Sequence, residues 1–364
     1  MIHDALLVGA RGYGAVHLRN LERLRARVRL VGLVDPSGGP LDGYGANVPV
    51  FQDLVGALSS GLRPDVVVIA TPTGTHLDLA LRALEVGADV YLEKPPVASM
   101  AQFTTLLDAQ ASTGRAIQVG FQSLGSHALA EISALGAVES VAAWGAWRRD
   151  AAYWHRSPWA GRRTLDGVPV VDGVLTNALS HAVATALRIA GARRADDVAR
   201  IELELHRAND IEADDTSVAR ITLWDGRRVT AALTLAADRD HDPLIEVRTD
   251  AGAVVLSYTR DELEHPDGTT VTTGRIDLFE ELLDHREGGI PLSSPLVDSG
   301  AFMTVLEAVR TAQAPTPIPA SRLLRVDGEH AVVSVTDIAD TVERTARAGA
   351  LFSELDAAPA AGHV

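Results

Sequence analysis

Short apolar runs alternate with amphipathic segments through the first third of the chain, and this alternation restricts the fold more than any other feature. The runs are "ALLV" at 5–8, "LVGLV" at 30–34, "DVVVIA" at 65–70, "ADVYL" at 88–92 and "AIQVG" at 116–120. They are short and almost wholly apolar, as expected of strands that are buried on both faces of a sheet. Because helical segments separate successive strands, the sequence predicts βαβ units and a parallel sheet.

A glycine-rich turn, "GARGYG", follows the first run and opens a segment with leucines at helical spacing. A dinucleotide pyrophosphate binds at such a helix N-terminus, next to backbone amides and the positive end of the helix dipole. Measured against G-x-G-x-x-G, Gly9 and Gly14 occupy the outer positions, Arg11 occupies the middle one and Gly12 follows. The pattern predicts dinucleotide binding through an incomplete motif.

Asp35 ends the second apolar run, 21 residues after Gly14. An acidic residue at this distance binds the adenosine ribose hydroxyls. Its carboxylate repels a 2′-phosphate, so we expect NAD to be preferred over NADP. Arg11 keeps NADP open, because a guanidinium beside the pyrophosphate can also reach a 2′-phosphate. A helix-capping turn and an ordinary surface aspartate form the alternative that these residues leave open.

Lys94, in "YLEKPPVAS", is the only lysine among 33 basic residues, all the others being arginine. Lysine is a compact charge whose pKa falls on burial, whereas a guanidinium stays charged. This difference suggests a chemical role for Lys94, with chance as the alternative.

Four motifs together resemble the Gfo/Idh/MocA oxidoreductases: "GARGYGAVH" at 9–17, "ATPTGTH" at 70–76, "EKPP" at 93–96 and "VGFQ" at 119–122. The resemblance is close over the first 122 residues and covers the rest in outline. It implies an α/β protein with an amino-terminal Rossmann domain and a carboxy-terminal α+β domain that has a large, mostly antiparallel open sheet. It also implies an NAD(P)-dependent oxidoreductase that acts on a CH–OH group of a sugar, polyol or sugar acid.

The expected domains are 1–121 and 122–355, followed by a disordered tail at 356–364. The resemblance implies that Lys94 contacts both the substrate hydroxyl and the nicotinamide region. The residues that it implies for cofactor binding are Gly9, Arg11, Gly12, Tyr13, Gly14, Asp35, Thr71, Pro72, His76, Glu93, Lys94 and Gln122.

The second domain contains strands of mixed polarity joined by short turns, which predict a largely antiparallel sheet. Helices are expected at about 275–286, 299–312 and 329–348. The segment "RRVTAALTLAA" has apolar residues on both sides. We therefore expect one face of the sheet to be open for a partner subunit, in a homodimer or homotetramer.

The segment from Gly173 to Gly191 has helical periodicity, so Asn177 and His181 should share a face. The family resemblance implies a D-x-x-x-H pair here, in which the histidine takes the hydroxyl proton and the aspartate holds the substrate. Asn177 departs from that pattern, because an amide can hydrogen-bond a hydroxyl but cannot take a proton. Lys94 is the alternative base if it is desolvated. The departure also leaves open a ligand sensor without turnover. A further alternative is an enzyme with recycled cofactor that carries out hydrolysis, elimination or epimerisation.

Four of the five tryptophans and five arginines lie within residues 144–163. Aromatic faces suit sugar rings and arginine forks suit carboxylates, so we predict that Tyr153, Arg156 and Trp159 bind the substrate together with Lys94, Asn177 and His181. A core or a subunit interface is the alternative.

A formal net charge of −15 argues against a nucleic-acid partner. The sequence contains neither an apolar run near the ~20 residues that span a bilayer nor a signal peptide, so we expect a cytoplasmic protein without a membrane partner. It has no cysteine, which excludes disulfides and thiolate chemistry, and we expect no metal.

Overall fold

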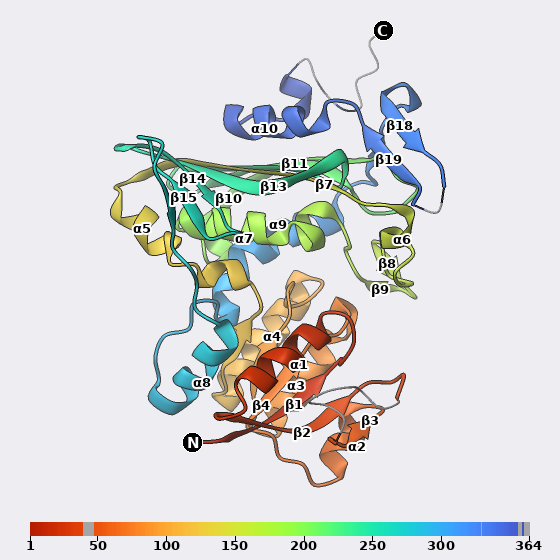
Figure 1. Ribbon diagram of the computed structural model, residues 1–364, viewed down its shortest axis with the longest axis vertical. Helices are drawn as coiled ribbons and strands as arrows, with labels where there is room; N and C mark the ends of the chain where they lie inside the picture. The colour runs from red at the N-terminus through yellow and green to blue at the C-terminus, as the bar shows by residue number, and fades with distance from the viewer. Residues whose placement is uncertain (39–46, 329, 356–358, 360–364) are drawn as a thin grey trace. The chain divides into compact units, whose positions relative to one another are not determined.

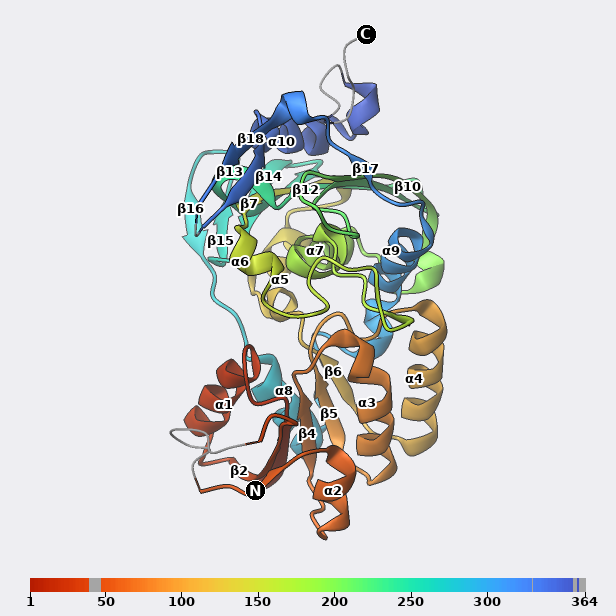
Figure 2. The same ribbon diagram turned by 90° about the vertical axis from the view of Figure 1, so that its right-hand side faces the viewer.

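The computed structural model describes residues 1–38, 47–328, 330–355 and 359 (Figure 1, Figure 2). The chain divides into two compact units, one formed by Met1–Phe121 and Ile276–Val297 and the other by Gln122–Arg275 and Asp298–Val364. The tail predicted at 356–364 lies, apart from Pro359, outside the described residues.

A parallel sheet of six described strands forms the centre of the first unit, in the order β3-β2-β1-β4-β5-β6. The strands are β1 (His3–Val8), β2 (Val28–Val34), β3 (Val50–Phe51), β4 (Val66–Ile69), β5 (Asp89–Leu92) and β6 (Ile117–Val119). The five predicted strands and the Rossmann fold are confirmed, whereas β3 is too short to give a pattern. The strand order reverses between β1 and β4, and ligands of such sheets bind beyond the carboxyl ends of the strands at this point.

Helices provide the crossovers of this sheet. They are α1 (Gly14–Arg23), α2 (Leu54–Ser59), α3 (His76–Glu85) and α4 (Met100–Thr113). Helix α4 has Ser99 as its N-cap, with the hydroxyl accepting from the Gln102 amide, and ends at Gly114 in the left-handed region. These local signals place both ends of the helix.

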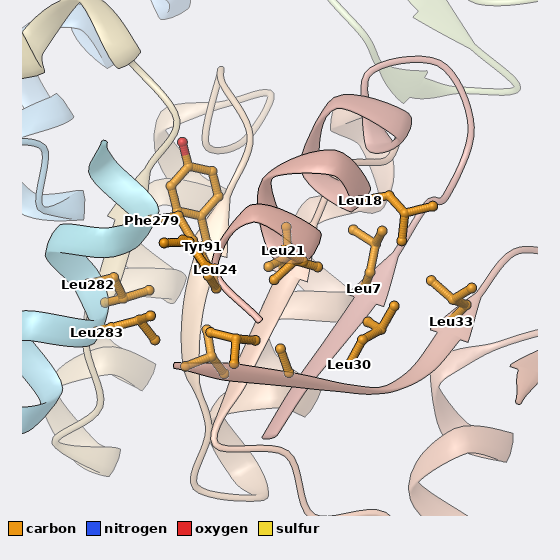
Figure 3. Packing of buried hydrophobic residues seen from close by; sticks show 14 of the residues in the cluster. Leu7, Leu18, Leu21, Leu24, Leu30, Leu33, Tyr91, Phe279, Leu282 and Leu283 are labelled. Atoms are coloured by element: carbon orange, nitrogen blue, oxygen red, sulfur yellow. The ribbon is translucent and has the colours of Figure 1, made fainter. Parts of the chain in front are cut away.

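One segment far along the chain belongs to the first unit, although the sequence analysis placed it in the second domain. Helix α8 (Leu278–Gly288) packs onto the core beside β1 and α1, with its apolar residues buried in the same cluster (Figure 3). These residues are Leu278, Phe279, Leu282 and Leu283. The contact joins residues more than 150 positions apart, so no local pattern predicts it.

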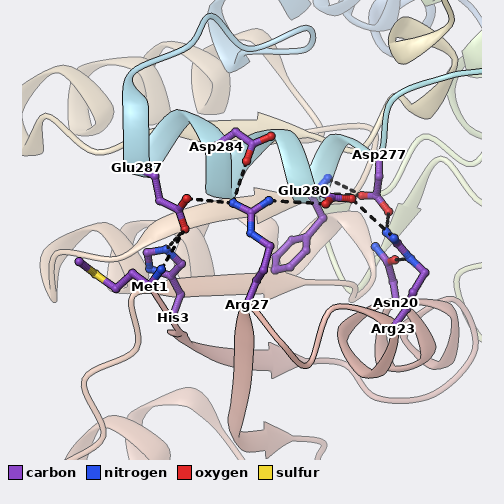
Figure 4. A network of polar contacts seen from close by, with 10 residues as sticks. Met1, His3, Asn20, Arg23, Arg27, Asp277, Glu280, Asp284 and Glu287 are labelled. Atoms are coloured by element: carbon purple, nitrogen blue, oxygen red, sulfur yellow. Dashed lines mark hydrogen bonds and ion pairs between the residues drawn. The ribbon is translucent and has the colours of Figure 1, made fainter.

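The charged face of α8 is matched by arginines of the first unit (Figure 4). Arg27 lies 2.7 Å from Asp284 and 3.1 Å from Glu287, and Arg23 pairs with Asp277. Each exposed pair contributes no more than about 1 kcal/mol, so the apolar contacts dominate the binding of this helix.

The second unit contains a sheet of nine described strands, in the order β16-β15-β14-β13-β7-β12-β11-β10-β17. Only two neighbouring pairs of these strands are parallel, β7 with β12 and β10 with β17, so the mostly antiparallel open sheet is confirmed. The strands are β7 (Val138–Arg148), β10 (Val198–Arg207), β11 (Thr216–Leu223), β12 (Arg228–Thr234), β13 (Ala236–Thr249), β14 (Gly252–Ser257), β15 (Glu262–Glu264), β16 (Thr270–Thr272) and β17 (Thr316–Pro317).

Helices cover both faces of the central strands. On one face α10 (Ile338–Ala348) buries Ile338 and Val342 against Trp144 and Ala232, and α7 (Ser180–Ile189) and α9 (Gly300–Thr311) lie on the opposite face (Figure 1). The prediction of an open face for a partner subunit is therefore corrected for these strands. An amphipathic helix of the same chain covers the apolar residues that suggested the interface.

The remaining described elements include α5 (Ala128–Ala134), α6 (Ala151–Trp154) and two small hairpins, β8–β9 (Thr164–Leu165 and Val168–Pro169) and β18–β19 (Leu323–Val326 and Val332–Val335). The helix predicted at 329–348 is thus shorter, because β19 occupies part of that range. None of the helices in the described ranges is long and apolar enough to cross a membrane.

Candidate functional site

The glycine turn after β1 is required by close backbone approach. A Cβ at Gly14 would stand 1.8 Å from the Gly9 oxygen, and a Cβ at Gly9 would stand 2.4 Å from the Ala70 oxygen at the end of β4. Gly12, with φ of +57°, has nothing within 4 Å of its Cβ position. The turn is therefore tight against the sheet and open above the start of α1, which fits a dinucleotide pyrophosphate.

Asp35 follows β2 and is already held by local donors. Its carboxylate accepts hydrogen bonds from the Ser37 amide at 3.0 Å and from the Ser37 hydroxyl. Arg11, in the middle position of the glycine motif, donates to the Ser37 hydroxyl at 2.7 Å and lies 3.7 Å from the Asp35 carboxylate. The two charges that bear on NAD or NADP preference therefore lie together at the end of β2.

His76 connects two loops of the predicted cofactor site. Its ring is buried, with Nε2 lying 2.8 Å from the Thr71 oxygen and Nδ1 lying 3.0 Å from the Pro95 oxygen. Burial lowers the pKa of His76, although the carbonyl oxygens oppose this shift. We expect His76 to hold the loop that contains Thr71 and the exposed Pro72 against the segment that follows Lys94.

Glu93 and Lys94 directly follow β5. The buried Glu93 carboxylate lies 2.8 Å from His17 Nε2 and accepts a hydrogen bond from the Lys94 amide at 3.2 Å. A Cβ at Gly120 would lie 2.8 Å from the same carboxylate, so only glycine leaves it this space. Glu93 thus fixes the backbone that presents Lys94, whose side chain is half-buried.

His17 was missed as a site residue, although it ends the motif "GARGYGAVH". It lies on α1 between the rings of Tyr13 and Tyr91, at centroid distances of 5.5 and 5.2 Å. Edge-on aromatic neighbours restrict the imidazole to the orientation that reaches Glu93. Only its position at the end of this motif could have identified His17 as a site residue, because helical spacing alone does not distinguish a functional histidine from a buried core histidine.

The segment predicted as one helix from Gly173 to Gly191 consists of two. A π-helical turn, η4 (Val174–Ala178), precedes α7, and the Leu179 amide donates to the Val174 oxygen at 3.0 Å. Apolar periodicity does not distinguish this i→i+5 bond from the usual i→i+4 bond. Such turns are frequent at functional sites. Asn177 therefore lies in η4 and His181 in the first turn of α7.

His181 is half-buried, and its Nδ1 lies 3.2 Å from the Ser123 hydroxyl. Ser123 in turn accepts a hydrogen bond of 2.8 Å from Thr185, one turn further along α7. Ser123 belongs to η3 (Gln122–Gly125), which begins with the predicted cofactor residue Gln122. Ser123 has no signal in the sequence, because its contact with His181 spans 58 residues.

Three predicted substrate residues stack on one another in the second unit. The Arg156 guanidinium lies 3.8 Å from the centroid of the Tyr153 ring and 4.6 Å from that of Trp159. It also lies 3.1 Å from Asp172, whose carboxylate accepts a hydrogen bond from the Asn177 amide. Burial raises the pKa of Tyr153. Asp172, which the sequence analysis did not single out, joins this cluster to η4.

Across the described residues, no group of three or more His, Asp or Glu side chains is arranged to hold a metal ion.

Comparison with known proteins gives one family match. Residues 4–121 match the model of the oxidoreductase family with an NAD-binding Rossmann fold. The inositol 2-dehydrogenase of Rubrobacter xylanophilus is 34% identical over 153 residues, which is 40% of this chain and 43% of that protein. The scyllo-inositol 2-dehydrogenase (NAD(+)) of Bacillus subtilis is 29% identical over 119 residues, 32% of this chain and 34% of that protein. The chain therefore matches less than half of the length of these relatives.

Among solved structures, the WlbA dehydrogenase from Bordetella pertussis, in complex with NADH and UDP-GlcNAcA, has a TM-score of 0.70. The similarity covers 85% of this chain and 95% of that one at 20% identity, and it shows a common fold.

Proposed function

Because residues 4–121 belong to the Gfo/Idh/MocA oxidoreductase family, we propose that the protein is an NAD(P)-dependent dehydrogenase that oxidises a secondary hydroxyl of a sugar, polyol or sugar acid. The observation that carries the proposal is the Lys94 segment, held by Glu93 and His17 at the carboxyl end of β5 in a Rossmann sheet. The inositol dehydrogenases among the similar proteins support the substrate class.

NAD would be held by the turn from Gly9 to Gly14 and by Asp35, and when bound it would supply the hydride acceptor for oxidation of the carbinol carbon. In the proposed mechanism Lys94 donates a hydrogen bond to the reacting oxygen and stabilises its developing negative charge. His181 takes the hydroxyl proton at Nε2, in the tautomer whose Nδ1–H donates to the Ser123 hydroxyl. Asn177 holds a neighbouring hydroxyl, and Tyr153 and Trp159 supply aromatic faces for the apolar side of the ring.

A panel of inositols, neutral sugars and sugar acids, each incubated with NAD and with NADP, tests the proposal. Absorbance of the reduced nicotinamide reports net oxidation, and chromatography of the sugar reports any other change. A dehydrogenase accumulates NADH or NADPH with at least one substrate. Sugar conversion without either reduced cofactor indicates a recycled cofactor, and the absence of both conversion and reduced cofactor indicates a binding protein without turnover.

We also propose that the chain forms a homo-oligomer. Because α10 covers the central strands, its interface would lie outside that face of the sheet.

A further inference from the structure

Asp172 is a buried carboxylate that the proposed chemistry does not use. Its side chain is 2% exposed, and it accepts hydrogen bonds from the Gly161 amide at 2.7 Å, from Arg156 at 3.1 Å and from the Asn177 side-chain nitrogen. Two donors come from the loop that follows α6, and the third comes from η4. These hydrogen bonds fix the orientation of the Asp172 carboxylate, which in turn restricts the side chains of Arg156 and Asn177.

The contact between Asp172 and Asn177 sets the orientation of the Asn177 amide. A carboxylate only accepts hydrogen bonds, and the amide nitrogen is the only donor of an asparagine side chain. The nitrogen must therefore face Asp172, and the amide oxygen must face another direction. Without the carboxylate, the two orientations of the amide would have nearly the same shape.

We propose that Asp172 is a positioning residue, which turns the Asn177 amide so that its oxygen accepts a hydrogen bond from a substrate hydroxyl. The substrate part of this inference rests on the proposed function. The orientation itself rests on the hydrogen bonds of the described residues. The group that Asn177 recognises is a substrate hydroxyl vicinal to the reacting one. The rest of the substrate can be charged or neutral, because an amide oxygen accepts a hydrogen bond from a hydroxyl without regard to the charge of the ligand.

The same contact explains why asparagine occurs where the family resemblance implies aspartate. An aspartate at 177 would bring two carboxylates to hydrogen-bond distance in a buried site, and like charges so placed cannot both ionise at low cost. The amide removes this repulsion and adds a donor. In this chain the negative charge is at 172 and the substrate-facing oxygen belongs to 177.

Arg156 acquires a different role from the one expected of it. Its guanidinium is stacked between Tyr153 and Trp159 and bound to Asp172, so it serves as the counter-ion of that carboxylate. From the sequence, Arg156 was expected to bind the substrate, because arginine forks suit carboxylates. As a counter-ion it should influence acidic and neutral substrates equally.

The test uses the full-length protein in three variants: Asn177→Asp, Asp172→Asn, and the exchange Asp172→Asn with Asn177→Asp. Asp166→Asn, the same chemical change on an exposed turn, is the matched control. Calorimetry at pH 5.5 and pH 8 measures thermal unfolding, which requires no substrate. Steady-state kinetics with one neutral and one acidic sugar from the panel measures kcat and KM for each.

In Asn177→Asp the new carboxyl beside Asp172 should have a pKa above its unfolded value, so the folded state retains a proton to higher pH. Stability relative to the wild type is then lost as pH rises. We expect the Tm of Asn177→Asp to lie further below that of the wild type at pH 8 than at pH 5.5. In the exchange variant, the difference in Tm from the wild type should be the same at both pH values. Among the described residues, the nearby charged or titratable groups include Arg156, Tyr153, Asp214, which lies behind Gly173, and His181, which lies one turn after Asn177 on α7. All of them are unchanged across the series.

For Asp172→Asn we expect kcat/KM to fall about tenfold for both sugars, as expected for one lost substrate hydrogen bond. An Asn177→Asp variant with the pH dependence of the wild type overturns the pairing, even if Asp172→Asn does not fold. A folded Asp172→Asn variant with the kcat/KM of the control overturns the positioning role. If the wild type converts no sugar, the proposed function fails, while the unfolding series still decides the pairing.

Discussion

Gly120→Ala should impair catalysis without a direct contact to substrate or cofactor. A Cβ at this position would stand 2.8 Å from one Glu93 carboxylate oxygen and 3.2 Å from the other. The oxygen has to move by about 0.6 Å to reach an ordinary contact of 3.4 Å. This oxygen makes the 2.8 Å contact with His17, and the other oxygen of the same carboxylate accepts the 3.2 Å bond from the Lys94 amide. A displaced carboxylate should therefore weaken both contacts.

The magnitudes follow from these two bonds. Weakening one or both should lower the free energy of unfolding by about 1–3 kcal/mol. Because a misplacement of about 1 Å can reduce a rate about 100-fold, we expect kcat to fall about 10- to 100-fold as the Lys94 backbone moves. NAD affinity should change by no more than a few fold, since the turn from Gly9 to Gly14 is untouched.

Steady-state kinetics, calorimetric titration with NAD and urea unfolding measure the three quantities. Gly56→Ala is the control, because a Cβ on α2 makes only an ordinary 3.4 Å contact with Asp53 and alanine favours a helix. Its kcat should equal that of the wild type. A Gly120→Ala enzyme with wild-type kcat would refute the role that we assign to the Glu93 carboxylate.

Three further predictions concern the cofactor, α10 and pH. Asp35→Ser should narrow a preference for NAD over NADP in binding titrations, because the serine removes the charge that repels a 2′-phosphate; an initial preference for NADP contradicts this. Ile338→Ala should lower the free energy of unfolding by about 2–5 kcal/mol in urea, whereas a loss near zero means that α10 does not cover the sheet. Burial lowers the pKa of His206 in the folded state. The unfolded chain binds a proton at this histidine near pH 6.5 and the folded chain does not, so the free energy of unfolding falls as pH falls below that value. Tm measured from pH 7.5 to 5 should therefore fall less in His206→Phe than in the wild type, and parallel curves would exclude this contribution.

The sequence predicts the first unit well because its information is local. Buried parallel strands are nearly continuous apolar runs, and the tight turn after β1 requires glycine at positions 9 and 14. The strands and the turn can therefore both be predicted from the sequence. The packing of α8 onto this unit cannot be predicted from the sequence, because Leu278 and Phe279 contact core residues that are distant in the sequence.

Sequence patterns describe the candidate site of the second unit less completely. Helical spacing selects Asn177 and His181, but it cannot reveal the π-helical turn between Gly173 and α7 or the hydrogen bonds to Asp172 and Ser123. An arginine in a tryptophan-rich segment suggests a ligand site, but the sequence does not reveal that its guanidinium also binds a carboxylate 16 residues away. Partners of charged groups depend on tertiary structure, which composition does not encode.

The most direct test of the account is the turnover of Lys94→Ala, measured with its affinity for NAD. If Lys94 acts on the reacting oxygen, kcat should fall by about 10²-fold or more while the dissociation constant for NAD stays within a few fold of the wild type. Lys94→Arg should fail too, because a planar guanidinium neither replaces the ammonium nor loses a proton near neutral pH. Near-normal turnover by Lys94→Ala would contradict the proposed mechanism.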